Sequence, residues 1–350
     1  MPEALPGKIT EKLFAGEKLC ESEYAELIRA NSPELRSILA EKASEKRKAV
    51  YGNSVFVRGL IEFTNCCKNN CLYCGIRASM RADRYRLSDE DILACCREGW
   101  SLGFRTFVLQ GGEDPAFTPE RIEKLVRAIK AGFPDCAVTL SVGEHPREVY
   151  ALWKAAGADR YLLRHETADR AHYEKLHPVA MSFDNRMRCL DDLKTLGYQV
   201  GCGMMIGSPY QTPETLAKDL AFIRDFRPQM VGMGPFIPAR GTPFEEEPAG
   251  TLEETLLLLS LTRLILPEVL LPATTALGTI HPQGRELGLL AGANVLMPNL
   301  SPVSVRKKYA LYDNKICTGD EAAQCLGCLK ARVRTTGCEI AQGRGDSKVK

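Results

Sequence analysis

Three cysteines in one short segment are the residues best suited to chemistry in this chain. Cys67, Cys71 and Cys74 have the spacing C-x3-C-x2-C, and the segment around them supplies no fourth ligand. Structural zinc sites use four ligands, usually arranged as two pairs. Three thiolates can instead hold three irons of a cubane cluster and leave the fourth iron open for a small molecule. The spacing therefore favours an open 4Fe–4S cluster, with zinc binding and incidental cysteines as the alternatives.

A second frame for the ligands includes the neighbouring Cys66. The pattern Cys66-x4-Cys71-x2-Cys74 matches the spacing of plant-type ferredoxins. Those ferredoxins are small, whereas this chain has 350 residues and a repeated strand–helix pattern. The context therefore favours the frame that leaves Cys66 out.

The same segment resembles the cluster motif of the radical S-adenosylmethionine (SAM) superfamily. It follows an expected strand, and the aromatic residue Tyr73 stands directly before the last cysteine. The resemblance implies a 4Fe–4S cluster whose open iron binds the amino and carboxylate groups of SAM. It also implies reductive cleavage of SAM to a 5′-deoxyadenosyl radical.

Composition excludes several other classes of protein. The chain has 46 basic and 44 acidic residues, a net charge of +2, so nothing indicates binding to nucleic acid or to a membrane surface. The first residues contain no apolar signal-peptide core, and the most apolar stretch, 256–271, is interrupted by Arg263, Pro267 and Glu268. We therefore expect a cytoplasmic protein whose fourteen cysteines are metal ligands or buried fillers rather than disulfides. The expected fillers are Cys95, Cys96, Cys136, Cys189 and Cys202.

Strands and helices alternate along most of the chain. Helices are expected to begin at Ser88, which has Asp91 three residues later, and at Thr118 and Thr212, each followed by proline. Eight strands alternating with helices predict a complete (β/α)8 TIM barrel of the α/β class, with an open doubly wound sheet as the alternative. The expected strands are 55–63, 105–110, 137–142, 160–164, 199–206, 230–234, 270–275 and 294–297.

No linker or repeat divides the chain. We expect an N-terminal helical extension at 1–50, the barrel at 51–300, and a short C-terminal extension at 301–350 that carries further cysteines. Active sites of such barrels lie at the C-terminal ends of the strands. The unusual residues of this chain fall at those ends.

Two of these positions follow the second and third expected strands. Gly111, Gly112 and Glu113 follow the second strand, where small residues allow close approach of the backbone to a ligand. By resemblance to the superfamily, this segment binds the SAM ammonium through backbone carbonyls; an ordinary turn is the alternative. Ser141 ends the third strand.

The fourth strand carries opposite charges. Arg164 and Glu166 are two residues apart and share a face of an extended segment, where they can pair with each other or with a zwitterionic ligand such as SAM. His165 points to the other face and is expected to contact a helix. Arg186 is a candidate for a bidentate contact with the SAM carboxylate, or else a solvated helix residue.

Four residues near the last strands complete the candidate site. Thr274 and Thr275 are either strand formers or hydroxyl donors to an anionic ligand at the end of the seventh strand. Tyr309 and Tyr312 are three residues apart and are expected to share a helical face that closes over the barrel.

Longer segments resemble the HydE family, the radical SAM maturases of iron-only (FeFe) hydrogenases. The resemblance extends from residue 20 to residue 330 and is carried by the segments 61–65, 160–167, 232–238, 272–279 and 291–301. It implies a substrate cavity inside a complete barrel. It implies SAM-binding roles for Ser141, Glu166 and Arg186, and substrate-binding roles for Arg164, Thr274, Thr275, Tyr309 and Tyr312.

The family resemblance also implies a substrate and partners. The substrate is an organometallic Fe(CO)2(CN)–cysteine precursor of the diiron subcluster, delivered by the companion maturase HydG. The GTPase scaffold HydF acts downstream, and a flavodoxin or ferredoxin supplies electrons. A second cysteine group, Cys317, Cys325 and Cys328, matches an auxiliary 2Fe–2S or 4Fe–4S cluster found in some members. Zinc, with Cys338 as fourth ligand, is the alternative.

Three other functions compete. Biotin synthase needs further cysteine ligands inside the barrel. Here Cys136 lies at the start of the third expected strand, which is the wrong end, and Cys202 stands alone on the fifth. Methylornithine synthase acts on a small amino acid and is harder to exclude, although the 272–279 segment favours the maturase. An iron–sulfur electron carrier or zinc scaffold would leave Arg164, Glu166 and Arg186 without a purpose.

Overall fold

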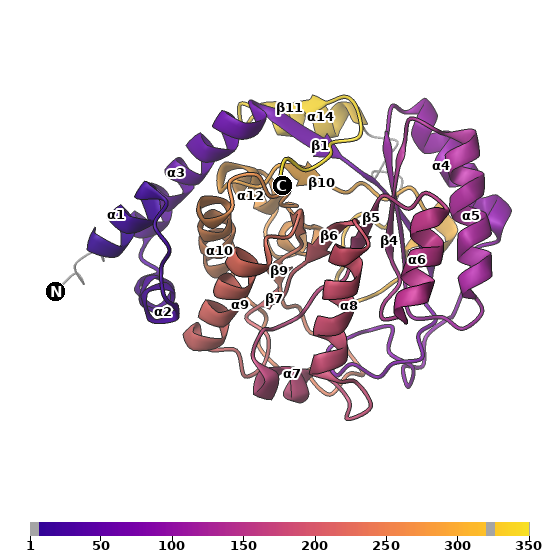
Figure 1. Cartoon of the computed structure of the whole chain (residues 1–350), viewed down its shortest axis with the longest axis horizontal. Coiled ribbons are helices and arrows are strands. Elements are labelled where there is room, and N and C mark those ends of the chain that lie inside the picture. The colour runs from indigo at the N-terminus through magenta and orange to yellow at the C-terminus, as the bar shows by residue number, and fades with distance from the viewer. Residues whose placement is uncertain (1–6, 320–325, 350) are drawn as a thin grey trace.

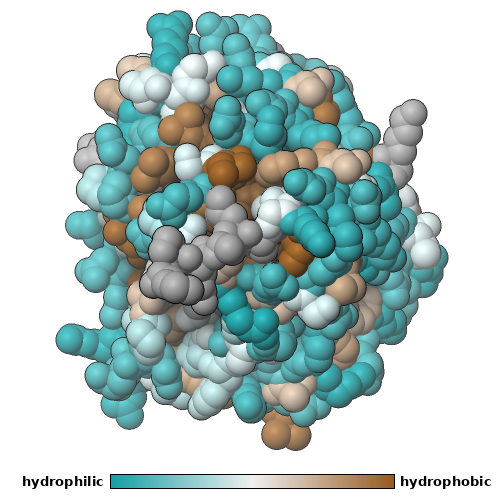
Figure 2. Space-filling view, turned by 90° about the vertical axis from the view of Figure 1, so that its left-hand side faces the viewer, coloured by the Kyte–Doolittle hydropathy of each residue, from teal (hydrophilic) through white to brown (hydrophobic). Residues whose placement is uncertain are grey.

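Helices precede the barrel in the computed structural model, which describes residues 7–319 and 326–349. They are α1 (Gly7–Ala15), α2 (Glu21–Ala30) and α3 (Pro33–Tyr51), at the left of Figure 1. Ser32 caps α3 by accepting a hydrogen bond from Leu35 N at 3.2 Å, and Pro33 occupies the first helical position. The side of the molecule that includes these helices is mainly hydrophilic, with scattered apolar side chains (Figure 2).

The strands form a closed parallel barrel, which confirms the predicted fold class. Six of them form one sheet in the order β2-β3-β4-β5-β6-β8, and β1 pairs with β10. Backbone hydrogen bonds close the ring: Val231 N donates to Leu270 O, Ala273 N to Val295 O, and Leu60 N to Pro298 O, at 2.9–3.0 Å. The strands are β1 (Ser54–Val57), β2 (Gly59–Thr64), β3 (Thr106–Gly111), β4 (Ala137–Ser141), β5 (Arg160–Leu162), β6 (Gln199–Cys202), β8 (Met230–Val231) and β10 (Val295–Leu296).

Four expected strands differ from the structure, and one of them, 230–234, is interrupted between Val231 and Gly234. The 55–63 strand is divided into β1 and β2 at Arg58, and the 199–206 strand breaks at Gly203. A side chain at Gly203 would lie 2.0 Å from Gly232 O, and its φ of +145° suits glycine, so the chain bends there. Beyond the bend, β7 (Met205–Ile206) pairs with β9 (Gly234–Pro235). The prediction of a strand at 270–275 was wrong at its C-terminal end, because Thr275 begins helix α11 (Thr275–Ile280) and Thr274 caps that helix.

Helices surround the strands and begin where the sequence predicts. Ser88, Thr118 and Thr212 each accept a hydrogen bond from the backbone three residues later. The five cysteines expected to be fillers are at most 5% exposed, which confirms that prediction. The helices are α4 (Asp89–Ser101), α5 (Pro119–Gly132), α6 (Arg147–Ala155), α7 (Arg170–Leu176), α8 (Phe183–Thr195), α9 (Pro213–Phe226), α10 (Leu252–Ile265) and α12 (Gly284–Leu290).

The C-terminal segment returns to the N-terminal end of the barrel. After α13 (Val303–Arg306) and α14 (Leu326–Arg334), strand β11 (Glu339–Ala341) pairs in parallel with β1. Asp346 then forms an ion pair with the buried Arg160 at 2.7 Å. In Figure 1 this segment lies at the opposite end of the barrel from α7. Within the described residues, no helix combines the length and apolar character needed to cross a bilayer.

Candidate active site

A cavity of about 370 Å³ occupies the C-terminal end of the barrel. Its volume lies within the range of roughly 300–1,000 Å³ that is typical of small-molecule sites. The cavity brings together all the residues that the sequence assigned to the primary cluster, SAM and substrate. They are Cys67, Cys71, Cys74, Gly111, Gly112, Glu113, Ser141, Arg164, Glu166, Arg186, Thr274, Thr275, Tyr309 and Tyr312.

The cysteine loop follows β2 and lies directly against the turn that follows β3. A side chain at Gly112 would lie 2.3 Å from Cys66 O and 2.6 Å from Cys67 Cβ, so only glycine allows this approach. The thiol of Cys66 faces Tyr85 O at 3.9 Å, and Cys66 does not line the cavity. This arrangement favours the ligand frame without Cys66.

Burial controls the protonation of these thiols. It raises the pKa of Cys71 and Cys67, and it raises the pKa of Cys74 to about 11. Without a metal, the three thiols therefore stay protonated at neutral pH, whereas metal ligation requires thiolates and displaces their protons. A donor set of three thiols suits a soft iron–sulfur group with one open position.

Two side chains from the α7–α8 connection lie against the cysteine loop. Met181 Sδ is 3.5 Å from Cys71 Sγ, and His177 Nε2 is 3.3 Å from the hydroxyl of Tyr73. Because His177 Nδ1 faces the carbonyl of Tyr173 at 2.9 Å, it carries the proton and Nε2 accepts from Tyr73. Neither His177 nor Met181 was predicted as a site residue, because no local sequence pattern marks them.

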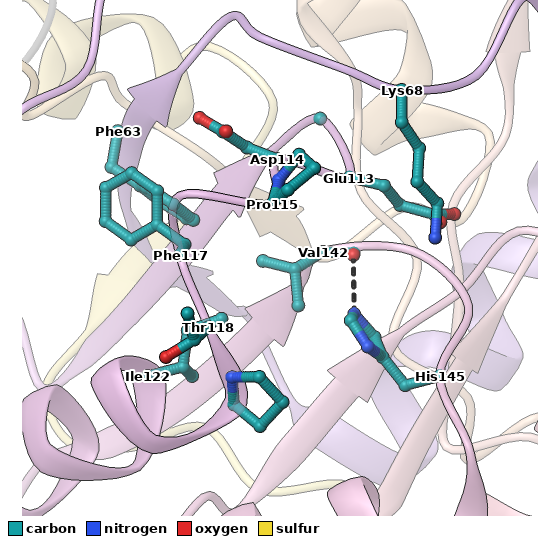
Figure 3. A pocket seen from close by; sticks show the side chains of 12 residues that line it. Phe63, Lys68, Glu113, Asp114, Pro115, Phe117, Thr118, Ile122, Val142 and His145 are labelled. Atoms are coloured by element: carbon teal, nitrogen blue, oxygen red, sulfur yellow. Dashed lines mark hydrogen bonds and ion pairs between the residues drawn. The ribbon is translucent and has the colours of Figure 1, made fainter.

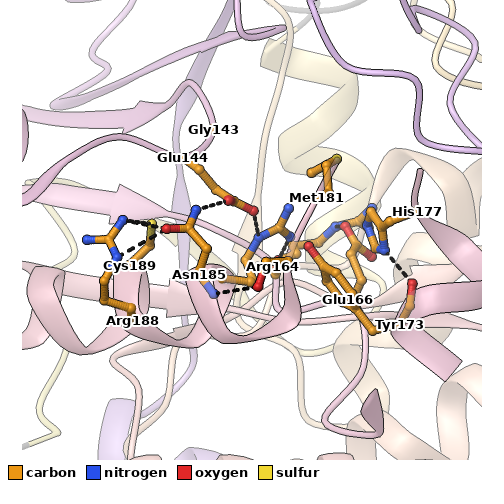
Figure 4. Close-up of polar contacts among 12 residues, drawn as sticks. Gly143, Glu144, Arg164, Glu166, Tyr173, His177, Met181, Asn185, Arg188 and Cys189 are labelled. Carbon is orange, nitrogen blue, oxygen red and sulfur yellow. Dashed lines mark hydrogen bonds and ion pairs between the residues drawn. The ribbon is translucent and has the colours of Figure 1, made fainter. Parts of the chain in front are cut away.

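The charged pair expected on the fourth strand is present. Arg164 Nε donates to Glu166 Oε1 at 3.0 Å (Figure 4). Glu166 has the left-handed φ of +65°, which is uncommon for a side chain other than glycine. Its second oxygen, Oε2, is buried and has no hydrogen-bond partner within the described part of the chain. A ligand that donates hydrogen bonds, such as an ammonium or a ribose hydroxyl, fits this acceptor.

His165 makes the helix contact that was expected. Its Nδ1 accepts from Gly203 N at 3.1 Å, so Nε2 donates to Asp219 of α9 at 3.2 Å. Asp219 also accepts a hydrogen bond from Ala168 N. These bonds hold both sides of Glu166, because they fix the residues before and after it.

Arg186 is buried and already has protein partners. Its Nε donates to Glu144 Oε1 at 2.6 Å and its Nη1 donates to Arg164 O. Because Glu144 occupies Nε, a ligand carboxylate cannot use that edge of the guanidinium, and the bidentate contact itself stays a prediction. The side chain still lines the cavity, and its Nη2 has no hydrogen-bond partner among residues 7–319 and 326–349.

The opposite wall carries the hydroxyl groups. Thr274 Oγ1 accepts from Leu277 N at 3.4 Å as the α11 cap, and Thr275 follows it. Tyr309 is 2% exposed, and its hydroxyl accepts from Gln110 Nε2 at 3.3 Å. The expected helical face for Tyr309 and Tyr312 is wrong, since α13 ends at Arg306. A non-helical segment carries both tyrosines into the cavity.

One charged group inside the barrel was not predicted. Glu62 on β2 is 1% exposed, forms an ion pair with Lys315, and accepts from Asn299 Nδ2 at 2.8 Å. Glu62 and Lys315 both line the cavity. A glutamate among the strand residues Ile61 and Phe63 was a usable signal, because buried carboxylates need a partner.

A smaller cavity of about 180 Å³ lies behind Glu113 (Figure 3). Its walls include Phe63, Phe117 and Val142, and Lys68 pairs with Glu113 at 3.1 Å on one side. Its volume is below the usual range for small-molecule sites. The larger cavity is therefore the candidate active site.

The second cysteine group is described only in part. Cys317 has φ of +63°, and its sulfur accepts from Arg285 Nη1 at 3.8 Å. Cys328 lies on α14 and is disulfide-bonded, so the expectation that the cysteines form no disulfides is wrong for this residue. Cys325 lies outside the described residues. Cys338, the possible fourth zinc ligand, is 1% exposed and packs in the hydrophobic core.

Comparisons with known proteins agree with this geometry. The family model described as the radical SAM superfamily matches residues 61–223. The [FeFe] hydrogenase maturase subunit HydE of Thermotoga maritima is 44% identical over 324 residues, which cover 92% of each chain. The 3-methylornithine synthase of Methanosarcina acetivorans is 31% identical over 87% of each chain.

Solved structures share the fold. The crystal structure of methylornithine synthase (PylB) matches with a TM-score of 0.85 and 29% identity, over 95% of this chain and 97% of the other. The structure of the maturase HydG from Carboxydothermus hydrogenoformans matches with a TM-score of 0.72 and 20% identity, over 83% and 70% of the two chains. At that identity, the HydG likeness shows the fold alone.

Proposed function

The chain belongs to the radical SAM superfamily and, within it, to the HydE family, and from this premise we propose its substrate and the roles of its residues. It is a radical SAM enzyme of hydrogenase maturation with a 4Fe–4S cluster and SAM as cofactors. We propose that Cys67, Cys71 and Cys74 hold the cluster. The cavity that joins these cysteines to the charged and hydroxyl residues of the opposite wall is the observation that carries the proposal.

When bound, the cluster supplies one electron to SAM, whose C5′–S bond then cleaves to methionine and a 5′-deoxyadenosyl radical. Glu166 accepts hydrogen bonds from SAM through its unpartnered Oε2, while Arg164 holds its other oxygen. Backbone carbonyls of Gly111, Gly112 and Glu113 bind the SAM ammonium. Ser141 contributes a hydroxyl group to the same wall.

Arg186 binds the SAM carboxylate through its remaining Nη2 group. Glu144 fixes the guanidinium by occupying Nε, so the cation enters the site already oriented. A preoriented cation loses little side-chain entropy when the ligand binds. The expected effect on affinity is therefore that of one charge-assisted hydrogen bond rather than of a two-point contact.

The substrate occupies the part of the cavity lined by Thr274, Thr275, Tyr309 and Tyr312, and Arg164, which lines the same cavity, binds it as well. We propose an Fe(CO)2(CN)–cysteine precursor of the diiron subcluster as substrate. Hydroxyl and guanidinium donors suit the cyanide nitrogen and the cysteine carboxylate of such a molecule. HydG would supply it, HydF would receive the product, and a flavodoxin or ferredoxin would supply electrons. The cytoplasmic location remains a prediction.

The test is anaerobic maturation in a defined mixture. Cluster-loaded protein, SAM and the HydG product should activate an apo-hydrogenase in the presence of HydF, and a Thr274→Val/Tyr309→Phe variant should cleave SAM yet activate poorly. Formation of 3-methylornithine from an amino-acid mixture, with no hydrogenase activation, would overturn the proposal in favour of the methylornithine synthases that share 31% identity.

Biotin synthase chemistry has less support. The relative from Cutibacterium acnes is 30% identical over 67% of this chain. Cys136 and Cys202 are fully buried and do not line the cavity. Among the cavity residues, the only thiols are therefore the three of the cysteine loop, which leaves no ligands for a second cluster there.

A further inference from the structure

A basic surface lies beside the cysteine loop, although the chain as a whole is nearly neutral. Seven cationic side chains gather there against three carboxylates, Asp83, Glu113 and Asp114, an excess of four positive charges compared with +2 for the entire chain. We call the seven the basic rim. They are Lys68, Arg77, Arg81, Arg84, Arg86, Lys307 and Lys308.

Contacts join the two segments of the basic rim, which are distant in the sequence. Lys308 Nζ forms an ion pair with Asp83 at 2.7 Å. The Asn65 amide donates to Lys308 O at 2.8 Å and to Asp83 O at 2.9 Å, so it binds both segments. Lys307 is consequently held next to the 81–86 segment.

Further hydrogen bonds attach the basic rim to the cysteine loop. Arg77 N donates to Cys74 O at 3.1 Å, and Ala78 N donates to Asn69 O at 2.8 Å. Arg84 donates to Ile76 O at 2.9 Å and to Arg77 O at 2.6 Å. The rim is therefore a fixed part of the loop that carries the three cysteines.

Four cations of the rim are exposed, and two of the three carboxylates are buried. The exposed cations are Lys68, Arg81, Arg86 and Lys307, whereas Arg77, Arg84 and Lys308 are half-buried. The side chains of Lys68 and Arg86 are 56% and 48% exposed, whereas their partners Glu113 and Asp114 are 8% and 0% exposed. Arg81 and Lys307 are exposed and form no ion pair with the described residues. Met80 lies against Gly241, whose backbone N donates to the Glu245 carboxylate at 2.7 Å, so a negative charge lies beyond the rim on that side.

We infer that the basic rim is the docking surface for an acidic protein that donates single electrons from a flavin or an iron–sulfur cluster. The inference rests on the proposed function, because each SAM cleaved consumes one electron and oxidises the donor by one electron. A positive surface steers an acidic partner and orients it, and electron-transfer complexes use small interfaces. A nucleic-acid partner is not favoured, because the excess charge is confined to this rim.

The test is direct binding of oxidised flavodoxin to the cluster-loaded protein, measured by calorimetry at low and moderate salt. The double variant Arg81→Glu/Lys307→Glu should raise Kd at least tenfold and remove most of its salt dependence. The milder Arg81→Gln/Lys307→Gln should give an intermediate Kd with an unchanged fold. The matched control is Lys124→Glu/Lys330→Glu, which reverses two exposed lysines on α5 and α14 and should keep Kd within twofold.

A second readout separates this inference from the proposed function. SAM cleavage driven by dithionite should be the same in the Arg81→Glu/Lys307→Glu variant and the parent, while cleavage driven by reduced flavodoxin should fall. Equal loss of flavodoxin binding in the Lys124→Glu/Lys330→Glu control would overturn the docking surface, as would an unchanged Kd in the rim variant. Tight binding of single-stranded RNA to the rim would show that the partner of this surface is a nucleic acid and would overturn the inference of an electron donor. Failure of the parent to cleave SAM with dithionite would instead overturn the proposed function.

Discussion

Lys315, which follows the last barrel strand, reaches into the barrel and pairs with Glu62 on β2 at 2.5 Å. Lys315 Nζ also donates to Tyr309 O at 2.9 Å and lies 4.8 Å from the Tyr309 ring centre. Both charges are largely buried, with side-chain exposures of 9% and 1%. This pair fixes the segment that carries Tyr309 and Tyr312 across the cavity.

Removing one member of the pair should destabilise the protein. Lys315→Met leaves the Glu62 carboxylate buried with only Asn299 as partner. Breaking a buried ion pair in this way should lower the free energy of unfolding by about 3–5 kcal/mol. Adding Glu62→Gln should recover part of that loss, because the uncompensated charge is gone. Urea unfolding of the apoprotein measures both variants, and a loss below about 1 kcal/mol for Lys315→Met would contradict this account.

The cysteine loop makes a separate prediction about ligands. After anaerobic reconstitution, Cys71→Ala should lose the cubane EPR signal and SAM cleavage, because a three-thiol site cannot spare a ligand. Cys66→Ala is the matched control and should keep both, since its thiol faces Tyr85 O. A cluster that survives Cys67→Ala but not Cys66→Ala would show that the ferredoxin-type frame is correct.

The proposed contacts of Arg186 and Glu166 with SAM can be tested by measuring the affinity of variants for SAM. Arg186→Ala should raise the Kd of SAM by about ten- to a hundredfold, since a hydrogen bond to a charged group contributes about 1.5–3 kcal/mol. Arg186→Lys should recover only part, because an ammonium cannot hold Glu144 and the ligand in the same plane. Glu166→Gln should also raise the Kd of SAM, and this variant should retain the cluster.

Calorimetric titration of SAM into the cluster-loaded variants measures these effects. Arg188→Ala is the matched control on the same helix, because Arg188 does not line the cavity and is 43% exposed. Affinities within twofold of the parent for both Arg186→Ala and Glu166→Gln would remove these residues from the SAM site.

Stability should depend on pH through His177. Burial, followed by the nearby Arg186 charge, lowers the pKa of His177 to about 4, whereas an unfolded histidine titrates near 6.5. Above pH 6.5 both states are neutral and His177 contributes nothing to the pH dependence. As the pH falls from 6.5 towards 4, only the unfolded chain takes up the proton, so the free energy of unfolding decreases.

Between pH 7.5 and 5.0 this effect amounts to about 2 kcal/mol. His177→Gln keeps an acceptor for Tyr73 but does not titrate. Between pH 7.5 and 5.0, the free energy of unfolding of this variant should therefore decrease by about 2 kcal/mol less than that of the parent. Urea unfolding of apo parent and variant at the two pH values gives the difference. The same pH dependence in both proteins would exclude His177 as the cause.

The second cysteine group should be dispensable for SAM cleavage. Replacing Cys317, Cys325 and Cys328 by serine should lower iron content while leaving dithionite-driven cleavage largely intact, because SAM binds to the cluster of the three-cysteine loop and not to the second cysteine group. Iron analysis and product quantification measure the two effects. Complete loss of cleavage in a folded triple variant would make this group an obligatory electron relay.

The sequence alone determined the features that depend on neighbouring residues. The C-x3-C-x2-C spacing, the alternation of strands with helices, and the caps at Ser88, Thr118 and Thr212 are local patterns. They were sufficient for the barrel and the cysteine loop. The remaining candidate site residues came largely from the resemblance to the HydE family, and Glu62, Met181 and Lys315 were missed although they line the cavity. The positions of Thr274 and Tyr309 were predicted, but not their local conformations.

Only the tertiary structure decided which of these residues pair. Glu62 and Lys315 are 253 positions apart, and Arg186 Nε is paired with Glu144, a partner that the sequence did not indicate. The left-handed backbone of Glu166 likewise depends on His165, Asp219 and Gly203, which lie on three separate elements. Such contacts follow from the closure and register of the whole barrel, because a buried charge selects whatever partner the completed packing brings within reach.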